Sequence, residues 1–550
     1  MEKSAILHFN NEEYLYKLNS DTYLFRLVSK KDDLKSVKFV YLDKYSYQYT
    51  HCKKKLKMTL VAKTTLHDYY EATIKIKAPS LKYYFILEGD DVSYFGNGLF
   101  FDSEPSDLRQ MFTVNTYNLD NSYLAVPDWS KGAIYYQIFP ERFAPTADYS
   151  PNWFKDNIDF RFRTNGTLRG ITKKLDYLSD LGIDVIYLNP IFLAHTSHRY
   201  DTVDYMQVCP LLGGDEALLE LVTEAHKRGI KVILDVAFNH TSTDFFAFKD
   251  LLLNQENSPY KDWYFIKKFP FKIGPNEYNS FGYFYFMPKL NTNNPEVISY
   301  LLKVTRHYLE KFGIDGFRLD VCDEVSHNFW QEFRTCVKKI NPEALILGEI
   351  WYESSPWLRG NEIDTITNYI SLNAIRDVCN EQIALSEFID TYETQRGRGN
   401  LNYLPATLNM ISNHDTERAL HAFKGDKDKL KLAMALNLTL PGGALIYYGD
   451  EMAMDGARDP DCRRGMRFDG DKEMYLYTKR LIAIHKLFKD KINVKFQADG
   501  QILSYKRDDY EIYLNFGKTP YPIMKRFDLI TNCFTETVLG GKAYVFKNKR

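Results

Sequence analysis

The chain has 550 residues, with 71 Lys and Arg against 72 Asp and Glu and a formal net charge of −1 at pH 7. This balance excludes a global basic field of the kind that binds nucleic acid or an anionic membrane, and it favours a neutral or small substrate. The length exceeds one compact core, so we expect about three domains.

The N-terminal residues hold no apolar run long enough for a secretory signal, and no later window approaches the roughly 20 apolar residues of a membrane span. We therefore expect a cytoplasmic protein. The 7 cysteines are widely spaced and include no Cys-x-x-Cys pair, which argues against a disulfide framework or a zinc site. We expect free thiols.

Residues 1 to about 122 alternate polar and apolar positions over short runs, such as 23–28, 37–41 and 72–76, with turn-forming residues between them. This pattern predicts an N-terminal β-sandwich with little helix. The segment contains no catalytic cluster. It is equally consistent with a binding or dimerisation module and with a purely structural domain.

From about Gly132 short apolar runs alternate with longer amphipathic stretches. Strands are predicted at 133–139, 184–188, 231–236, 316–321, 345–350, 365–370, 407–411 and 444–449, and helices near 171–181, 215–229, 295–312, 326–339 and 426–440. Eight strand–helix units predict an α/β fold, a (β/α)8 TIM barrel over 123–487. A doubly wound sheet is the weaker alternative.

Two further segments complete the predicted organisation. About 55 aromatic-rich residues separate the third strand from the helix at 295, which is too long for an ordinary barrel loop. We predict an inserted subdomain over about 241–294 that lies over the active-site face. Apolar runs at 502–505, 511–514 and 543–546 predict a small C-terminal β-domain over 488–550.

Polar residues gather where the predicted barrel strands end, which is where the functional groups of such a barrel collect. The motifs are His198-Arg-Tyr-Asp201, Asp235-Val-Ala-Phe-Asn-His240, Arg318 with Asp320, Glu349, and Ser412-Asn-His-Asp415. Each residue alone is more often structural. Their shared position at the strand ends of one barrel indicates a site.

Residues two apart on a strand face the same side, so Arg318 lies beside Asp320 and favours its ionised form, as a carboxylate nucleophile requires. A structural ion pair would have the same spacing. Glu349, framed by Ile350 and Trp351, is expected to have the partly apolar neighbourhood that a general acid needs. This pair matches retaining glycoside hydrolysis.

Asp415 and His414 are suited to bind sugar hydroxyls and to support the transition state of such a reaction. The competing interpretation of the cluster is a metal hydrolase. Arg318 disfavours it, because a guanidinium within the cluster would repel a cation.

The motifs resemble the conserved regions of the α-amylase family, glycoside hydrolase family 13, in the same order. The matching stretches are Asp235-Val-Ala-Phe-Asn-His240, Gly316-Phe-Arg-Leu-Asp320, Gly348-Glu-Ile-Trp351 and Ser412-Asn-His-Asp415. Four others resemble its neopullulanase, cyclomaltodextrinase and maltogenic amylase branch: Tyr136-Gln-Ile-Phe-Pro-Glu-Arg-Phe143, Met287-Pro-Lys-Leu-Asn-Thr292, Pro356-Trp-Leu-Arg-Gly360 and Asp459-Pro-Asp-Cys-Arg463.

The resemblance implies that Asp320 is the nucleophile, Glu349 the general acid/base and Asp415 the transition-state stabiliser. It further implies that the sugar at the cleavage point is held by Arg318, His240, His414 and Tyr200, with support from His198 and Asp235. On the leaving-group side it implies Glu324, Trp351, Tyr278 and Phe281. For these outer aromatic residues, packing in a core is about equally expected.

Two departures from the family pattern concern the acceptor side and calcium. Cys322 and Asp323 stand where the branch has Ala-Asn, which places an extra carboxylate near the leaving-group side. The loop 144–152 and the pair Gly166-Thr167 lack the hard oxygen ligands of the family's calcium site. We therefore expect no metal and no cofactor.

The resemblance implies a retaining α-glucan hydrolase that opens cyclodextrins and cuts maltodextrins at α-1,4 bonds, with some transglycosylation and with pullulan as a further substrate. The alternatives are a transglycosidase or isomerase that uses the same covalent intermediate, and a non-catalytic glucan-binding protein. The N-terminal domain implies a homodimer. The expected partners are otherwise an oligosaccharide substrate, with no nucleic acid and no membrane.

Overall fold

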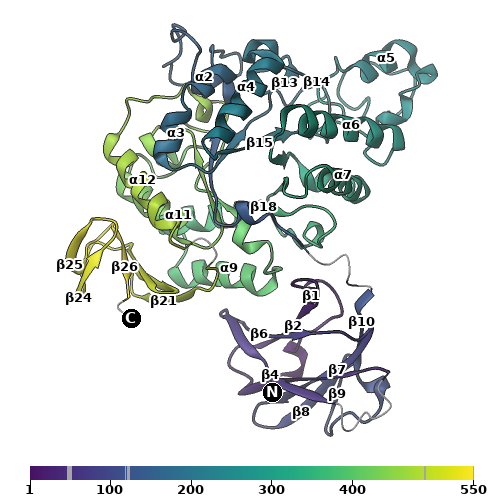
Figure 1. Ribbon diagram of the computed structural model, residues 1–550, viewed down its shortest axis with the longest axis vertical. Coiled ribbons are helices and arrows are strands. Elements are labelled where there is room, and N and C mark those ends of the chain that lie inside the picture. The colour runs from purple at the N-terminus through teal and green to yellow at the C-terminus, as the bar shows by residue number, and fades with distance from the viewer. Residues whose placement is uncertain (46–52, 118, 120–123, 489–490, 549–550) are drawn as a thin grey trace. The chain divides into compact units, whose positions relative to one another are not determined.

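The computed structural model describes residues 1–45, 53–117, 119, 124–488 and 491–548 (Figure 1). The chain divides into two compact units. The first consists of Met1–Ala125, Glu353–Asn361 and Ala384–Leu404, and the second of Val126–Tyr352, Glu362–Ile383 and Pro405–Arg550. The predicted domain boundary between residues 122 and 123 lies outside the described residues.

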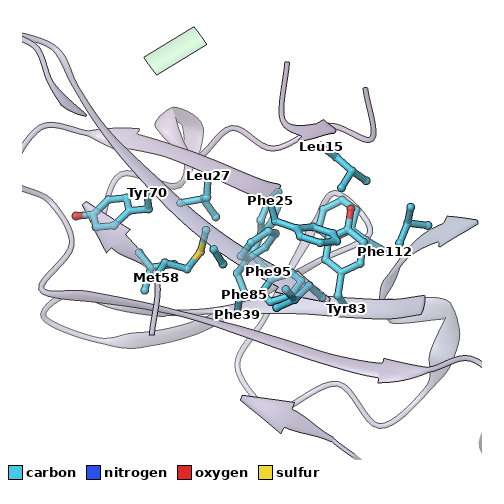
Figure 2. Packing of buried hydrophobic residues seen from close by; sticks show 14 of the residues in the cluster. Leu15, Phe25, Leu27, Phe39, Met58, Tyr70, Tyr83, Phe85, Phe95 and Phe112 are labelled. Atoms are coloured by element: carbon cyan, nitrogen blue, oxygen red, sulfur yellow. The ribbon is translucent and has the colours of Figure 1, made fainter. Parts of the chain in front are cut away.

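Two antiparallel sheets form most of the first unit. The first sheet has the order β1 (Leu15–Lys17), β2 (Thr22–Lys30), β6 (His67–Lys75), β5 (Thr59–Lys63). The second has the order β4 (Lys54–Lys57), β3 (Ser36–Asp43), β7 (Ser80–Glu88), β8 (Val92–Gly96), β9 (Leu99–Phe101), and β10 (Phe112–Asn115) pairs with β7. Alternate residues pack in a core rich in aromatic rings, including Phe25, Phe39 and Phe85 (Figure 2). The predicted N-terminal β-domain is confirmed.

Helix α9 (Leu385–Arg398) also belongs to this first unit, although it lies far along the chain. The Arg396 guanidinium donates to the carbonyl of Val61 at 2.6 Å. Buried Arg26 donates to the carbonyl of Gly399 at 2.9 Å. The helix is therefore held against the first sheet by hydrogen bonds to backbone carbonyls.

Eight parallel strands close into a barrel in the second unit. They are β11 (Ile134–Ile138), β12 (Val185–Leu188), β15 (Lys231–Val236), β16 (Gly316–Leu319), β17 (Leu345–Ile350), β18 (Thr365–Asn368), β19 (Leu408–Asn409) and β20 (Gly443–Tyr447). The last strand pairs with the first, with Tyr135 opposite Leu445. Every residue of these strands except Lys231 is buried, as expected for parallel strands covered on both faces. The predicted (β/α)8 barrel is confirmed.

Helices connect most of these strands (Figure 1): α2 (Leu168–Thr172), α3 (Leu175–Leu181), α4 (Gly214–Lys227), α6 (Pro295–Phe312), α7 (His327–Ile340), α8 (Tyr369–Cys379), α11 (Lys427–Thr439) and, after the last strand, α12 (Lys472–His485). In α6 the Asn294 side chain caps the first turn and Gly313 ends the helix with φ +65°. One predicted unit is wrong. Only a 3-10 turn, η9 (Ser355–Trp357), joins β17 to β18, because the connection contains Pro356 and Gly360, which disfavour a helix.

Two additions decorate the barrel. A hairpin of β13 (Phe192–Ala194) and β14 (Thr202–Val208) follows β12, and the segment after β15 contains α5 (Phe246–Asn254) and short 3-10 turns around buried aromatic rings.

A single antiparallel sheet follows α12. Its order is β21 (Lys495–Asp499), β22 (Ile502–Arg507), β23 (Tyr510–Asn515), β26 (Ala543–Lys547), β24 (Tyr521–Asp528), β25 (Cys533–Val538). The C-terminal β-domain is confirmed.

The sequence also led us to expect no membrane-spanning helix and free cysteine thiols. None of the described helices is long and apolar enough to cross a lipid bilayer. The six described cysteines are free thiols, and Cys52 lies outside the described residues.

Candidate active site

A cavity of about 640 Å³ lies at the carboxyl ends of the barrel strands. It brings together nine of the predicted site residues: His198, Tyr200, His240, Phe281, Asp320, Glu324, Glu349, Trp351 and Asp415. Arg318 and His414 do not line the cavity, but both are buried and contact residues that do. Six of the nine were predicted from their position at strand ends, and Phe281, Glu324 and Trp351 were implied by the family resemblance.

The Arg318 guanidinium is the centre of this site. Its Nη1 lies 2.8 Å from Asp320 Oδ1 and 2.8 Å from Asp235 Oδ1, and its Nη2 lies 2.6 Å from Glu349 Oε1. All four side chains are almost completely buried. One cation thus holds three carboxylates that come from three neighbouring strands.

The environment of Glu349 differs from the apolar one that we predicted. Its Oε1 accepts hydrogen bonds from the Tyr369 hydroxyl at 3.0 Å and from the Trp351 indole N–H at 3.2 Å, in addition to the Arg318 contact. Its Oε2 accepts the backbone N–H of Val321 at 3.0 Å. The prediction was wrong because Trp351 contacts Glu349 through its polar N–H, and because Arg318, Tyr369 and the Val321 N–H, which sequence order does not place beside Glu349, add further polar contacts.

Three buried carboxylates around one guanidinium leave an excess of negative charge. Burial raises the pKa of Asp235 to about 6, and Arg318 opposes this shift. Burial also raises the pKa of Asp320, again against Arg318, and the nearby Glu349, Asp235 and Asp415 add to the rise. Because like charges this close together oppose one another's ionisation, Asp320 and Asp235 bind a proton more readily than isolated aspartates do.

Val321, the residue after Asp320, has a left-handed backbone with φ +47°. This conformation is rare for a β-branched side chain and costs on the order of 1–3 kcal/mol. It points the Val321 N–H at Glu349. The strained turn therefore connects the ends of the two strands that carry Asp320 and Glu349.

The three histidines of the site are neutral at pH 7. Burial is the largest cause that lowers the pKa of His198 and of His240 to about 3, and it lowers the pKa of His414 well below its usual range. His240 Nε2 is buried without a hydrogen-bond partner among the described residues. A hydroxyl of a bound sugar would supply that partner.

His414 connects Asp415 to Tyr200. Its Nε2 contacts the Tyr200 hydroxyl and lies 3.0 Å from Asp415 Oδ2. The Tyr200 hydroxyl also donates to Asp235 at 2.7 Å, and the ring of Tyr200 is stacked on that of His414. Arg463 binds the other oxygen of Asp415 at 3.1 Å. Asp415 is thus oriented from two sides.

The outer aromatic residues divide into two groups. Phe281 stacks on His240 with centroids 5.0 Å apart and lines the cavity, as does Trp351, which stacks on Tyr369 at 3.8 Å. Tyr278 does not line it. Its ring packs among Phe248 and Phe271 in the inserted segment, so the core interpretation holds for this residue.

Comparison with known proteins adds to this geometry. The family described as "Alpha amylase, catalytic domain" matches residues 137–508. The chain belongs to the α-amylase family. A second family, "Alpha amylase, N-terminal ig-like domain", matches residues 1–118. Both matches agree with the resemblance found in the motifs.

Named members of the α-amylase family are similar over nearly the whole chain. A cyclomaltodextrinase of Geobacillus thermopakistaniensis is 38% identical over 94% of this chain and 89% of its own, and Neopullulanase 2 of Thermoactinomyces vulgaris is 38% identical over 88% and 84%. A solved structure named cyclomaltodextrinase has a TM-score of 0.92 and 34% identity, with both chains fully covered.

Several residues of this α-amylase family site escaped the sequence analysis. Arg463 was noticed only as part of a motif, yet it orients Asp415 and pairs with Asp459 at 2.8 Å. Tyr369 was placed inside a predicted strand, although it is the first residue of α8, directly after a strand end. Tyr369 would have directly followed the predicted strand if that strand had ended two residues earlier, at Asn368.

The residues described by the structure include no group of three or more His, Cys, Asp or Glu side chains suited to hold a metal ion. The three clustered carboxylates are occupied by Arg318 instead. The expectation that the reaction needs no metal stays a prediction.

Proposed function

We propose that this member of the α-amylase family cleaves α-1,4-glucosidic bonds of cyclodextrins and maltodextrins with retention of anomeric configuration. The observation that carries the proposal is the pairing of Asp320 and Glu349 on one buried guanidinium, with Asp415 lining the same cavity as both. Relatives named cyclomaltodextrinase and neopullulanase support this choice of substrates.

The first step forms a covalent glycosyl-enzyme. A carboxylate oxygen of Asp320 bonds to the anomeric carbon while the glycosidic C–O bond breaks and its electron pair stays on the leaving oxygen. Glu349 gives its proton to that oxygen. The reaction requires Asp320 to be ionised when Glu349 is protonated, and Arg318, which contacts both carboxylates, opposes the rise that burial causes in the pKa of Asp320.

The second step releases the sugar. Glu349, now ionised, takes a proton from water while the water oxygen bonds to the anomeric carbon and the ester bond to Asp320 breaks. A sugar hydroxyl can replace water, which gives transglycosylation. Asp415 and the neutral His240 hold hydroxyls and stabilise the oxocarbenium-like transition state, while His414 positions Asp415 and Tyr200.

Retention is supported by the contact of both carboxyl groups with Arg318. Asp320 and Glu349 bind neighbouring nitrogens of one guanidinium, at 2.8 and 2.6 Å. This arrangement favours the separation of about 5–5.5 Å found in retaining enzymes over the ~6.5–9.5 Å that leaves room for an attacking water.

A product profile tests the proposal. The enzyme is incubated with cyclodextrin, linear maltodextrin and pullulan, and the products and their first-formed anomer are followed by chromatography and NMR. We expect cyclodextrin and maltodextrin cleavage with the α-anomer formed first. Products formed only when glucose is added would favour a transglycosidase or isomerase, and binding without turnover would favour a non-catalytic protein.

We also infer that the protein is a cytoplasmic homodimer. A relative named intracellular maltogenic amylase, from Bacillus subtilis, is 34% identical over 94% of this chain. The N-terminal β-domain is the expected dimerisation module. We expect light scattering at micromolar concentration to give twice the monomer mass of 64.5 kDa, and a monomeric mass would contradict the dimer.

A further inference from the structure

Asp323 and Tyr352 connect two barrel loops at the edge of the cavity. Asp323 lies in the 3-10 turn η8 (Cys322–Glu324) that follows β16, and Tyr352 lies two residues beyond the end of β17. The Tyr352 hydroxyl donates to Asp323 Oδ2 at 2.5 Å. The loop after the Asp320 strand is thus tied to the loop after the Glu349 strand.

The pair lies on the leaving-group side of the site. The acid that protonates the leaving oxygen is Glu349, and Trp351, which donates to Glu349, directly precedes Tyr352. Asp323 lines the same cavity as Glu349 and is tied through Tyr352 to the loop that follows the Glu349 strand. We therefore place Asp323 beside the path of the leaving sugar and of an incoming acceptor.

The Asp323 carboxylate retains the capacity to bind a ligand. Asp323 lines the cavity, and among the described residues it forms no ion pair and only its Oδ2 accepts a hydrogen bond. The neighbouring Glu324 differs, because Lys289 binds its carboxylate at 3.0 Å. The hydrogen bond to Asp323 raises the pKa of Tyr352 to about 12.

We propose that Asp323, positioned by Tyr352, binds a hydroxyl of the sugar on the leaving-group side and thereby favours transfer to a sugar acceptor over transfer to water. The inference rests on the proposed function. In the transfer step the acceptor oxygen bonds to the anomeric carbon, the ester bond returns its electron pair to Asp320, and the acceptor proton goes to Glu349. Asp323 takes no part in the bond changes, so its effect is on acceptor binding.

The test measures how the glycosyl-enzyme divides between water and glucose. α-Maltosyl fluoride is the donor, because its leaving group is fluoride and places no sugar on the leaving-group side. The ratio of transfer product to hydrolysis product is determined at fixed glucose concentration. This ratio does not depend on how much of a variant is folded, so a merely structural defect would not change it.

We expect the ratio to fall about tenfold in Asp323→Ala, as for loss of one hydrogen bond to a charged acceptor. The isosteric Asp323→Asn and the positioning variant Tyr352→Phe should lower it about threefold. The double variant Asp323→Ala, Tyr352→Phe should match Asp323→Ala alone, because Tyr352 acts through Asp323.

Tyr475→Phe is the matched control, because the Tyr475 hydroxyl donates to Asp180 at 2.7 Å in a similar pair that does not line the cavity. Its ratio should equal that of the unmodified protein. Normal fluoride release with an unchanged ratio in both Asp323 variants would overturn this inference alone. An unmodified protein that releases no fluoride would overturn the proposed function and the inference with it.

Discussion

Asp320→Asn is expected to lower kcat/KM for cyclodextrin opening by about 10⁴-fold or more, a loss typical of removing a nucleophile. The amide keeps the shape of the side chain but cannot form the glycosyl ester. Arg318 would still hold Asp235 and Glu349, so the site keeps its support. The measurement is the initial rate of ring opening, followed by chromatography, against the unmodified protein.

The stability of this variant separates a chemical defect from a folding defect. Replacing Asp320 removes one of three buried carboxylates that compete for a single guanidinium, so we expect the unfolding midpoint to stay level or rise. Asp176→Asn, at an exposed aspartate that pairs with Arg228, is the control and should retain full activity. A variant that opens cyclodextrin at close to the original rate would rule out Asp320 as nucleophile.

The barrel was predictable because its strands are short, largely apolar runs that contrast with the amphipathic helices between them. α6 shows this well: its predicted and observed bounds coincide, since Asn294, Pro295 and Gly313 mark its ends. Helix α9 was missed. Only Phe388, Glu393 and Gly397 are buried along it, so it has no apolar stripe to read.

The residues of the site that lie at the ends of barrel strands were predictable from the sequence. Asp320, Glu349 and Asp415 meet in one cavity, because parallel strands of a barrel end at one face. What sequence could not show is the detailed environment of each group. The contact of Arg318 with Glu349 crosses from one strand to the next, and the position of Tyr278 depends on how the inserted segment packs around its own aromatic core.

Arg318→Met is expected to remove the charge that the whole site depends on. Methionine has a similar length but leaves Asp235, Asp320 and Glu349 buried without a cation. Breaking a buried ion pair from one side typically costs about 3–5 kcal/mol of stability. We expect a loss of that size at neutral pH, measured by denaturant unfolding, together with the loss of most activity.

Arg334→Met is a matched control for this change, because Arg334 also pairs with a buried aspartate, Asp364, at 2.6 Å, and Lys338 shares that partner. It should cost less stability and leave the pH profile of activity unchanged. The double variant Arg318→Met, Asp235→Asn should recover part of the lost stability, because one fewer carboxylate then lacks a partner. A double variant no more stable than Arg318→Met would contradict the charge argument.

The pH dependence of Arg318→Met distinguishes lost charge from lost packing. Arg318 lowers the pKa of Asp320 and of Asp235 against the rise caused by burial, so its removal raises both further. A folded-state pKa above the unfolded value means that the folded state holds a proton that the unfolded chain releases. The resulting penalty is absent below the unfolded pKa and grows as pH rises towards the folded one. The stability deficit should therefore widen between about pH 5 and pH 8. The acid limb of kcat/KM should also move to higher pH, because Asp320 acts only when ionised.

The measurement is denaturant unfolding of Arg318→Met and of the unmodified protein across this pH range. A stability deficit that stays constant with pH would mean that Arg318 contributes packing alone.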